Sequence, residues 1–256
     1  MTRVALVQLE ITTSSKEERL GHALELIDRA KAKDKDVDLI LLPELWNLGY
    51  FEFARYRAAA EPLSGPTLSA LAAKAQELRA YILAGSIVER EEERLYNTSA
   101  LIGPEGGIVA AYRKIHLFSF HSREKELLAP GDQVVVAETE LGTLGLSICY
   151  DLRFPELYRA QVDRGAEVFL VVASWPPARI EHWRLLCRAR ALENQSFLLG
   201  CNAAGSRYGG HSLVVSPQGE ILMEIADTEE VLEVELDLEE VTRARAEFPT
   251  LRDRAL

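Results

Sequence analysis

The sequence predicts a layered α/β fold in one domain that spans all 256 residues. Short apolar runs that are typical of buried strands alternate with longer segments whose apolar residues recur at helical spacing. No linker, repeat or low-complexity tract interrupts this alternation, and a chain of this length can bury one large core. Strands and amphipathic helices that alternate in this way pack in layers, with helices outside the sheets.

The expected strands and helices follow one another along the whole chain. The strand-like runs are residues 4–9, 37–42, 81–88, 99–102, 108–112, 134–138, 143–148, 168–172, 197–201, 213–216, 220–225 and 231–234. The clearest helices are 16–32, 67–79, 155–163, 181–193 and 238–247. Before the first helix, Ser14 or Ser15 can cap the N-terminus, and Glu17 or Glu18 can complete a capping box.

Cys149 lies where the apolar strand 143–148 runs into a helix start at 154–156, which contains a proline and an acidic residue. A thiol at this corner is expected at the carboxyl edge of the sheet, near backbone N–H groups that can hold an anion. Such surroundings would lower the pKa of the thiol and favour the thiolate. The alternative is a buried and inert cysteine.

Two other segments favour a functional cysteine. Glu44 follows an apolar run and a proline and is surrounded by leucine and tryptophan, where a carboxylate is rare unless it is paired or functional. Burial would raise its pKa and suit it to act as a general base, unless it faces solvent at a helix start. Lys114 also follows an apolar run, at 108–112, although a basic pair such as Arg113 and Lys114 is often only a solvated loop.

Glu44, Lys114 and Cys149, in this order and each at the end of a strand-like run, resemble the Glu-Lys-Cys triad of the nitrilase superfamily of carbon–nitrogen hydrolases. The resemblance covers almost the whole chain. Its other matching segments are residues 3–9, 41–44, 96–98, 112–118, 188–195, 210–212 and 217–220. The resemblance implies a four-layer αββα sandwich, in which helices lie outside two sheets.

The same resemblance implies the chemistry of an amidase. Cys149 attacks the substrate carbonyl to give a thioester, and Glu44 carries the protons. Lys114 and the backbone N–H of Tyr150 stabilise the oxyanion. The family has a second glutamate before a turn that resembles residues 128–131, and the count falls on Glu124.

Glu126 is the competitor for the place of the second glutamate, because it lies in the same charged run. Either glutamate could instead be a solvated loop charge.

The residues after the cysteine resemble those of the ω-amidase and deaminated-glutathione-amidase group, whose members cleave the terminal amide of short dicarboxylic monoamides such as 2-oxoglutaramate. Arg153 would then bind the distal carboxylate of the substrate bidentately, unless it forms a salt bridge with Asp151 or Glu156. Trp175 would form a wall of the pocket, unless it is ordinary core packing. The chain departs from many relatives at Trp175-Pro176, where they have Phe-Asn, and at its C-terminal end.

Two rival functions remain open at this stage. One is another reaction of the superfamily, such as hydrolysis of an aliphatic amide or an N-carbamoyl compound. The other is a non-enzymatic scaffold on the same fold, which the presence of all three triad residues disfavours.

Composition limits the partners. The net charge of −11 argues against a broad nucleic-acid or anionic-membrane surface. No apolar run approaches the ~20 residues of a membrane helix, and the start is too quickly polar for a signal peptide. The resemblance implies a small amide substrate and a homodimer or higher homo-oligomer.

The numbers and positions of the cysteines and histidines bear on the redox compartment and on metal binding. Three scattered cysteines predict no disulfide framework, and Cys187 and Cys201 are expected to be small core residues. A reducing cytoplasm fits this pattern. The five histidines show no metal-ligand spacing with the cysteines, so we expect no metal and no cofactor.

Overall fold

The computed structural model describes residues 1–12, 14–31 and 37–255, and its strands form two large sheets. The first sheet has its strands in the order β15 (Glu230–Leu236), β1 (Thr2–Gln8), β2 (Leu39–Leu41), β3 (Tyr81–Leu83), β5 (Arg94–Ile102) and β4 (Ile87–Glu91), with β6 (Ile108–Arg113) also paired to β5. The strands β1, β2 and β3 are parallel, and the others join them antiparallel.

The second sheet has its strands in the order β14 (Ile221–Glu224), β13 (Leu213–Val215), β10 (Phe197–Asn202), β9 (Val168–Ala173), β8 (Gly142–Ile148) and β7 (Val136–Thr139). Its central strands β8, β9 and β10 are parallel. A small hairpin, β11 (Ala204–Gly205) with β12 (Tyr208–Gly209), lies outside both sheets.

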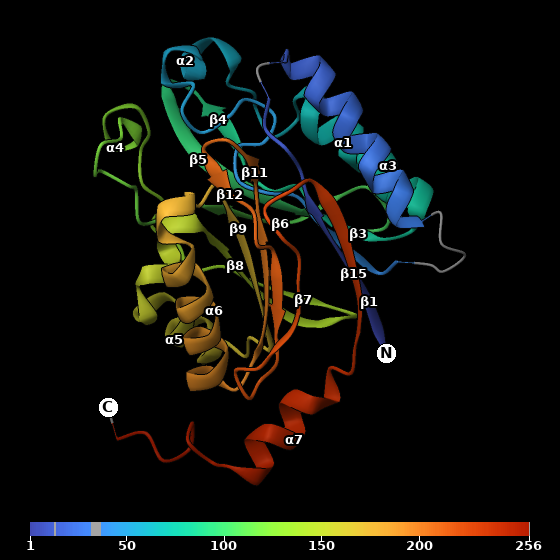
Figure 1. The fold of residues 1–256 in the computed structure, drawn as a ribbon, viewed down its shortest axis with the longest axis vertical. Helices are drawn as coiled ribbons and strands as arrows, with labels where there is room; N and C mark the ends of the chain where they lie inside the picture. Colours follow the sequence, from blue (N-terminus) through green and yellow to red (C-terminus); the bar gives the residue numbers. More distant parts are fainter. Residues whose placement is uncertain (13, 32–36, 256) are drawn as a thin grey trace.

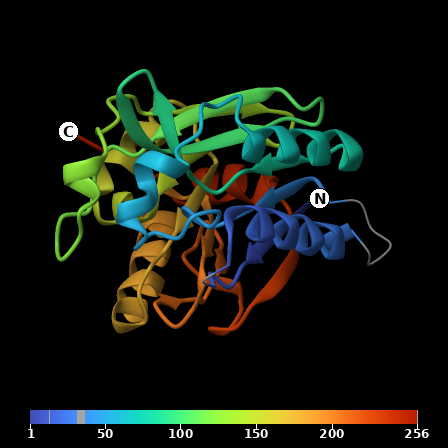
Figure 2. The same cartoon turned by 90° about the horizontal axis from the view of Figure 1, so that it is seen from above.

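Helices cover the outer faces of the two sheets. Helices α1 (Lys16–Lys31) and α3 (Pro66–Leu78) pack on the first sheet, and α5 (Pro155–Val162) and α6 (Ile180–Asn194) pack on the second (Figures 1 and 2). The remaining helices are α2 (Tyr56–Ala59), α4 (Glu124–Leu127), α7 (Glu239–Glu247) and the 3₁₀ turns η1 (Phe53–Arg55), η2 (Cys149–Arg153) and η3 (Pro177–Arg179). The expected αββα sandwich is confirmed.

The side-chain alternation of the strands explains why there are two apolar layers. In β1, Val4 and Leu6 pack between the sheets, whereas Ala5 and Val7 face α1 and α3. Successive residues of a strand point to opposite faces, so a strand that is buried on both sides reads as a continuous apolar run. The apolar run of β2 is explained in the same way.

The prediction of one continuous strand over residues 81–88 is wrong, and the difference affects the site. The chain forms β3 and β4 as separate strands, with Gly85 between them at φ +66°. A Cβ at Gly85 would lie 2.0 Å from the carbonyl oxygen of Pro43, so no other residue fits there. The break therefore brings the backbone against the segment that carries Glu44.

Other differences concern one strand end and two additional elements. The strand expected at 99–102 begins at Arg94. The hairpin β11–β12 and the short helix α4 were not expected. The capping box of α1 is confirmed and uses Ser15 and Glu18, whose side chain and backbone atoms exchange two hydrogen bonds. The predicted end of that helix at residue 32 lies outside the described residues.

Candidate active site

Cys149 stands at the carboxyl end of β8, as the first residue of η2. Its φ of +49° is in the left-handed region, which costs a non-glycine residue on the order of 1–3 kcal/mol and often occurs at active sites. The residue is half-buried and lines a pocket with an empty volume of about 450 Å³. The strand-to-helix corner thus presents the thiol to this pocket.

The expected lowering of the thiol pKa is wrong. Burial raises the pKa of Cys149 well above its usual value, and the negative charge of Glu44 adds to this effect. Lys114 and the backbone N–H of Ser174 act in the opposite direction but do not outweigh it. The resting residue is therefore a neutral thiol, which needs a base before it can attack a carbonyl.

Glu44 lies just after β2 and is fully buried. Its Oε1 accepts hydrogen bonds from Asn97 Nδ2 at 2.8 Å and Lys114 Nζ at 2.8 Å, and its Oε2 accepts one from the backbone N–H of Ser174 at 2.9 Å. The Ser174 hydroxyl also donates to the Glu44 backbone carbonyl at 2.8 Å. The carboxylate is thus held from three sides, beside the thiol of Cys149.

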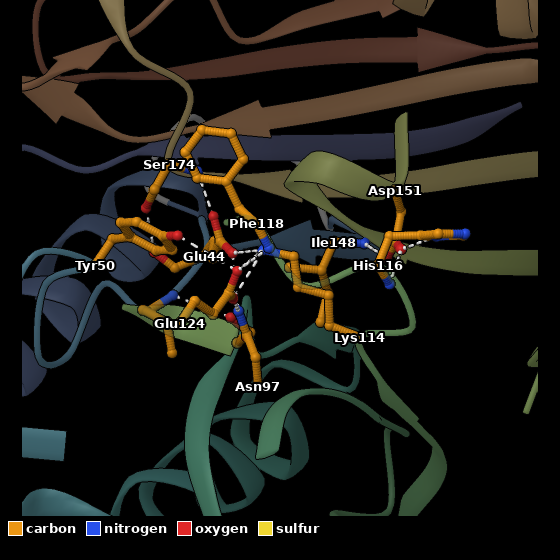
Figure 3. Close-up of polar contacts among 12 residues, drawn as sticks. Glu44, Tyr50, Asn97, Lys114, His116, Phe118, Glu124, Ile148, Asp151 and Ser174 are labelled. Carbon is orange, nitrogen blue, oxygen red and sulfur yellow. Dashed lines mark hydrogen bonds and ion pairs between the residues drawn. The ribbon is translucent and has the colours of Figure 1, made fainter. Parts of the chain in front are cut away.

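Lys114 follows β6 and is also buried. Its Nζ lies 2.8 Å from Glu44 Oε1 and 2.9 Å from Glu124 Oε1, so one ammonium bridges two carboxylates (Figure 3). Burial alone would lower the pKa of Lys114, but the two carboxylates outweigh it and raise that pKa well above its usual value. Lys114 is therefore a permanent cation in the site.

The structure places Glu124, and not Glu126, in this cluster. Glu124 is fully buried at the start of α4 and accepts hydrogen bonds from the backbone N–H of Phe118 at 2.7 Å and from Tyr50 Oη at 3.3 Å. Burial raises its pKa, and the charge of Glu44 acts in the same direction. Glu126 is exposed and pairs with Arg123 on the surface.

Asn97 is a site residue that sequence reasoning did not single out. Its Nδ2 donates to both Glu44 Oε1, at 2.8 Å, and Glu124 Oε1, at 2.9 Å (Figure 3). The signal was present, because Asn97 is a buried amide inside β5, whose residues are almost all buried. A buried polar side chain in a strand needs partners, and here the partners are the two carboxylates.

Asp151 is a second residue whose part was missed. Its buried carboxylate accepts hydrogen bonds from the backbone N–H of Ile148 at 2.9 Å and from Tyr112 Oη at 2.7 Å. It also accepts one from the backbone N–H of His116 at 3.0 Å and contacts the His116 ring at 2.7 Å (Figure 3). One carboxylate therefore ties the corner that carries Cys149 to the loop that carries Lys114.

Tyr150 is the second residue of η2, and its ring lies edge-on to Phe118 at a centroid distance of 5.0 Å. The first N–H groups of a helix have no partner within that helix. The backbone N–H of Tyr150 is thus a suitable donor for an anion that forms next to Cys149.

Arg153 and Trp175 lie on the wall of the same pocket. The guanidinium of Arg153 stacks over the Trp175 ring at 4.7 Å, and burial lowers the pKa of Arg153. Among the described residues Arg153 forms no ion pair with Asp151 or Glu156, so that alternative is not what the structure contains. The remaining walls are mainly aromatic: Tyr50, Phe51, Phe118 and Tyr150.

In the part of the chain that the structure describes, no three histidine, cysteine or acidic side chains lie close enough together to hold a metal ion. No helix there is both long and apolar enough to cross a membrane. Cys187 and Cys201 are buried core residues, as expected.

Known proteins resemble the chain over nearly its full length. The sequence model of the Carbon-nitrogen hydrolase family matches residues 3–246. The 2-oxoglutaramate amidase of Paenarthrobacter nicotinovorans is 39% identical over 264 residues, which cover 98% of this chain and 88% of that protein.

Solved structures give the same picture. Saccharomyces cerevisiae Nit3, a member of branch 10 of the nitrilase superfamily, superposes with a TM-score of 0.92 at 32% identity, over 100% of this chain and 97% of that one. A glutamate-to-glutamine mutant of the amidase from Nesterenkonia sp. AN1 carries the acetamide moiety of fluoroacetamide on its active-site cysteine. It superposes with a TM-score of 0.87 at 26% identity, over 99% and 94% of the two chains.

Proposed function

Because the chain belongs to the carbon–nitrogen hydrolase family, we propose that it hydrolyses the terminal carboxamide of a small dicarboxylic ω-amide, such as 2-oxoglutaramate, to a carboxylate and ammonia. The observation that carries this proposal is the position of Cys149. It stands at the mouth of the Glu44–Lys114–Glu124 cluster, in a pocket that also contains Arg153.

Acylation begins with the neutral thiol. Glu44 accepts the proton of Cys149 as the sulfur attacks the amide carbon, which gives a tetrahedral adduct with a negative oxygen. The Lys114 ammonium and the Tyr150 backbone N–H stabilise that oxygen. Glu44 then donates its proton to the leaving nitrogen, so that ammonia departs and a thioester remains on Cys149.

Deacylation uses the same groups in the reverse sense. Glu44 removes a proton from a water molecule, which attacks the thioester carbon, and the returning proton regenerates the thiol. Glu124 acts through Lys114: together with Glu44 it keeps Lys114 charged, and the amide of Asn97 donates a hydrogen bond to each of the two carboxylates. Loss of one oxyanion donor typically costs about 2.7–4 kcal/mol in transition-state stabilisation.

The ω-amide specificity rests on Arg153. A guanidinium that stacks on a tryptophan in an aromatic pocket is well placed to grip a carboxylate with two parallel hydrogen bonds. The relative from P. nicotinovorans is named for a substrate that carries such a carboxylate at the end opposite its amide.

The test is Arg153→Gln. We expect kcat/KM for glutaramate and 2-oxoglutaramate to fall by roughly 10²–10³, because a charge-assisted bond contributes about 1.5–3 kcal/mol and a bidentate one more. Arg153→Lys should not restore the rate, since an ammonium lacks the planar fork. Turnover of butyramide, which has no distal charge, should change far less. Equal losses on charged and neutral amides would mean that Arg153 only supports the loop after Cys149.

The rival reactions are separated by their products. An N-carbamoyl hydrolase releases CO₂ with the ammonia, whereas an amidase releases ammonia alone. A panel of succinamate, glutaramate, 2-oxoglutaramate, glutamine, a nitrile and an N-carbamoyl amino acid distinguishes these reactions. We expect the highest kcat/KM for the ω-amides, without CO₂.

We also propose that the protein forms a homo-oligomer and is located in the cytoplasm. Leu185 and Leu192, seven residues apart on one face of α6, are exposed, and the turn before β14 lies against Leu192. Exposed leucines on one face of a helix fit burial against a second copy. Light scattering should give a dimer or larger species, and the double variant Leu185→Glu and Leu192→Glu should be monomeric.

The three free cysteines fit the proposed cytoplasmic location, because the cytoplasm is a reducing compartment.

A further inference from the structure

The pocket at Cys149 differs in charge from the rest of the chain. The protein carries a net charge of −11, yet the charged side chains that line this pocket are Lys114, Arg153 and Arg179. Lys114 is neutralised by its two glutamates. Among the residues with described positions, none forms an ion pair with Arg153 or Arg179. The pocket therefore offers two guanidinium groups to whatever enters it.

Trp175 connects the two arginines. Arg153 stacks over its ring, and its indole N–H donates to the backbone carbonyl of Arg179 at 2.8 Å. Arg179 ends the short turn η3, and its guanidinium lies over Phe120 at 5.4 Å. Both arginines line the pocket beside Trp175. Burial lowers the pKa of Arg153, and the like charge of Arg179 adds to that lowering. Arg153 nevertheless stays charged at neutral pH.

Two unpaired cations that share one pocket repel each other in the empty enzyme, and an anionic group between them removes that repulsion. One carboxylate can satisfy one guanidinium fork, which leaves the second fork for a neighbouring oxygen. A positive group at the same place would meet two like charges.

We propose that Arg179 is a second specificity residue, which binds the distal end of the substrate together with Arg153 and selects against a positive charge there. This inference rests on the proposed ω-amidase function and narrows it. The preferred substrates carry an oxo, hydroxy or unsubstituted carbon next to the distal carboxylate. An amino acid ω-amide, with an ammonium on that carbon, is a poor substrate.

The experiment compares kcat/KM of the wild type and Arg179→Gln for 2-oxoglutaramate, glutaramate, L-glutamine and butyramide. For the first two, loss of one charge-assisted bond should lower kcat/KM by roughly 10- to 100-fold. Glutamine should change by less than about 3-fold, because lost attraction for its carboxylate offsets lost repulsion of its ammonium. Butyramide should also stay within about 3-fold. The preference for the oxo acid over the amino acid thus falls.

Arg29→Gln is the matched control. Arg29 is exposed on α1 and does not line the pocket, so its loss changes the net charge of the protein by the same amount. It should change all four kcat/KM values by less than about 2-fold. Arg179→Lys, which keeps the charge without the fork, should give an intermediate loss on the two anionic amides.

The outcomes separate the two claims. If the wild type prefers butyramide to both anionic amides, the proposed function is wrong, whatever Arg179→Gln does. If the wild type prefers the anionic amides but Arg179→Gln keeps the preference for 2-oxoglutaramate over glutamine, the inference about Arg179 alone is overturned. Equal losses on all four substrates also overturn it, because they indicate that Arg179 only supports the turn below Trp175.

Discussion

At the scale of single residues, the site is a balance of buried charges around a thiol. Glu44 and Glu124 face one ammonium, that of Lys114, and the amide of Asn97 donates to both carboxylates. Breaking one member of such a buried group leaves an uncompensated charge, which typically costs about 3–5 kcal/mol. In the proposed mechanism Glu44 accepts the proton of Cys149, because the thiol lies beside it.

The state of the thiol gives a pH prediction. Iodoacetamide reacts with the thiolate, and the pKa of Cys149 is raised by burial and by Glu44. The alkylation rate of the wild type should therefore still rise with pH beyond pH 9. In Glu44→Gln the carboxylate is gone while Lys114 still lowers the thiol pKa, so the profile should shift to lower pH.

Cys149→Ala supplies the background for this measurement, since Cys187 and Cys201 are buried. A wild-type rate that is already constant from pH 7 upwards would mean a resting thiolate, and Glu44 would not be needed to deprotonate Cys149.

Asn97→Asp tests the balance of the cluster. The change replaces a donor by a third carboxylate in contact with Glu44 and Glu124, so we expect kcat to fall by at least about 10²-fold. Such crowded carboxylates have pKa values above those of the unfolded chain. The destabilisation should therefore be small near pH 5, where protons bind, and grow towards pH 8, as thermal unfolding at both pH values can measure.

The control on the same strand is Ser99→Ala, which removes a buried hydroxyl that has no hydrogen-bond partner among the described residues. It should leave kcat unchanged and stability nearly so. If Asn97→Asp also left kcat and stability unchanged, the contacts of Asn97 with the two carboxylates would not be needed for activity.

At the scale of elements, the break between β3 and β4 supports the segment that carries Glu44. The backbone N–H of Ser86 donates to the Pro43 carbonyl at 3.2 Å, and the Trp46 indole N–H donates to the Ala84 carbonyl at 2.8 Å. The close approach of Gly85 to Pro43 makes both contacts possible. The turn thus fixes where the carboxylate of Glu44 stands.

Gly85→Ala should displace that segment. The added Cβ meets the Pro43 oxygen, and φ is +66°, so we expect a loss of about 1–3 kcal/mol in the free energy of unfolding. Because a shift of about 1 Å in a catalytic group can cost ~10²-fold, kcat should fall more than stability alone explains.

The matched glycine is Gly21, inside α1, where an added Cβ meets nothing within 4 Å. Gly21→Ala should leave kcat unchanged and stabilise the protein by up to about 1 kcal/mol in denaturant unfolding. Equal activity in both variants would show that the turn at Gly85 does not position Glu44.

These elements also show how far the sequence can be interpreted. The strands β2, β6 and β8 were predictable because apolar runs mark buried strands, and the residues that follow them were therefore candidates. The break at Gly85 was not, because apolar residues lie on both sides of Gly85 and Ser86, and only the approach of Pro43 requires a turn there. Asn97 and Asp151 were missed because their partners are distant in sequence, such as Glu44, 53 residues from Asn97.

The direction of the shift in the pKa of the Cys149 thiol was predicted wrongly for a related reason. The helix start beside Cys149 was visible in the sequence, but the burial of the thiol and the proximity of Glu44 depend on how the two sheets meet. The local sequence indicates that a helix dipole could lower the thiol pKa. The desolvation that raises this pKa depends on the packed structure.

At the scale of the whole molecule, the site forms where the carboxyl ends of parallel strands from both sheets meet. Glu44 follows β2 of the first sheet, whereas Cys149 and Ser174 follow β8 and β9 of the second. The hydrogen bond from Ser174 to Glu44 joins residues 130 apart in sequence across the two sheets. The fold and the family predicted from the sequence are confirmed. The αββα arrangement therefore brings Cys149 and Glu44, the proposed nucleophile and base, together only when both sheets are packed.

The central claim is that Cys149 carries a thioester formed from an ω-amide, and mass spectrometry of Glu44→Gln with glutaramate tests it most directly. Without the proton carrier, both formation and hydrolysis of the acyl-enzyme should be slow, so the variant is incubated with glutaramate for many turnover times of the wild type, and the acyl-enzyme that forms should persist. We expect the protein mass to increase by one glutaryl group, and peptide mapping should locate that group on Cys149. Cys149→Ala should show no adduct and release no ammonia. An adduct on another residue, or ammonia release by Cys149→Ala at a rate near that of the wild type, would contradict the account.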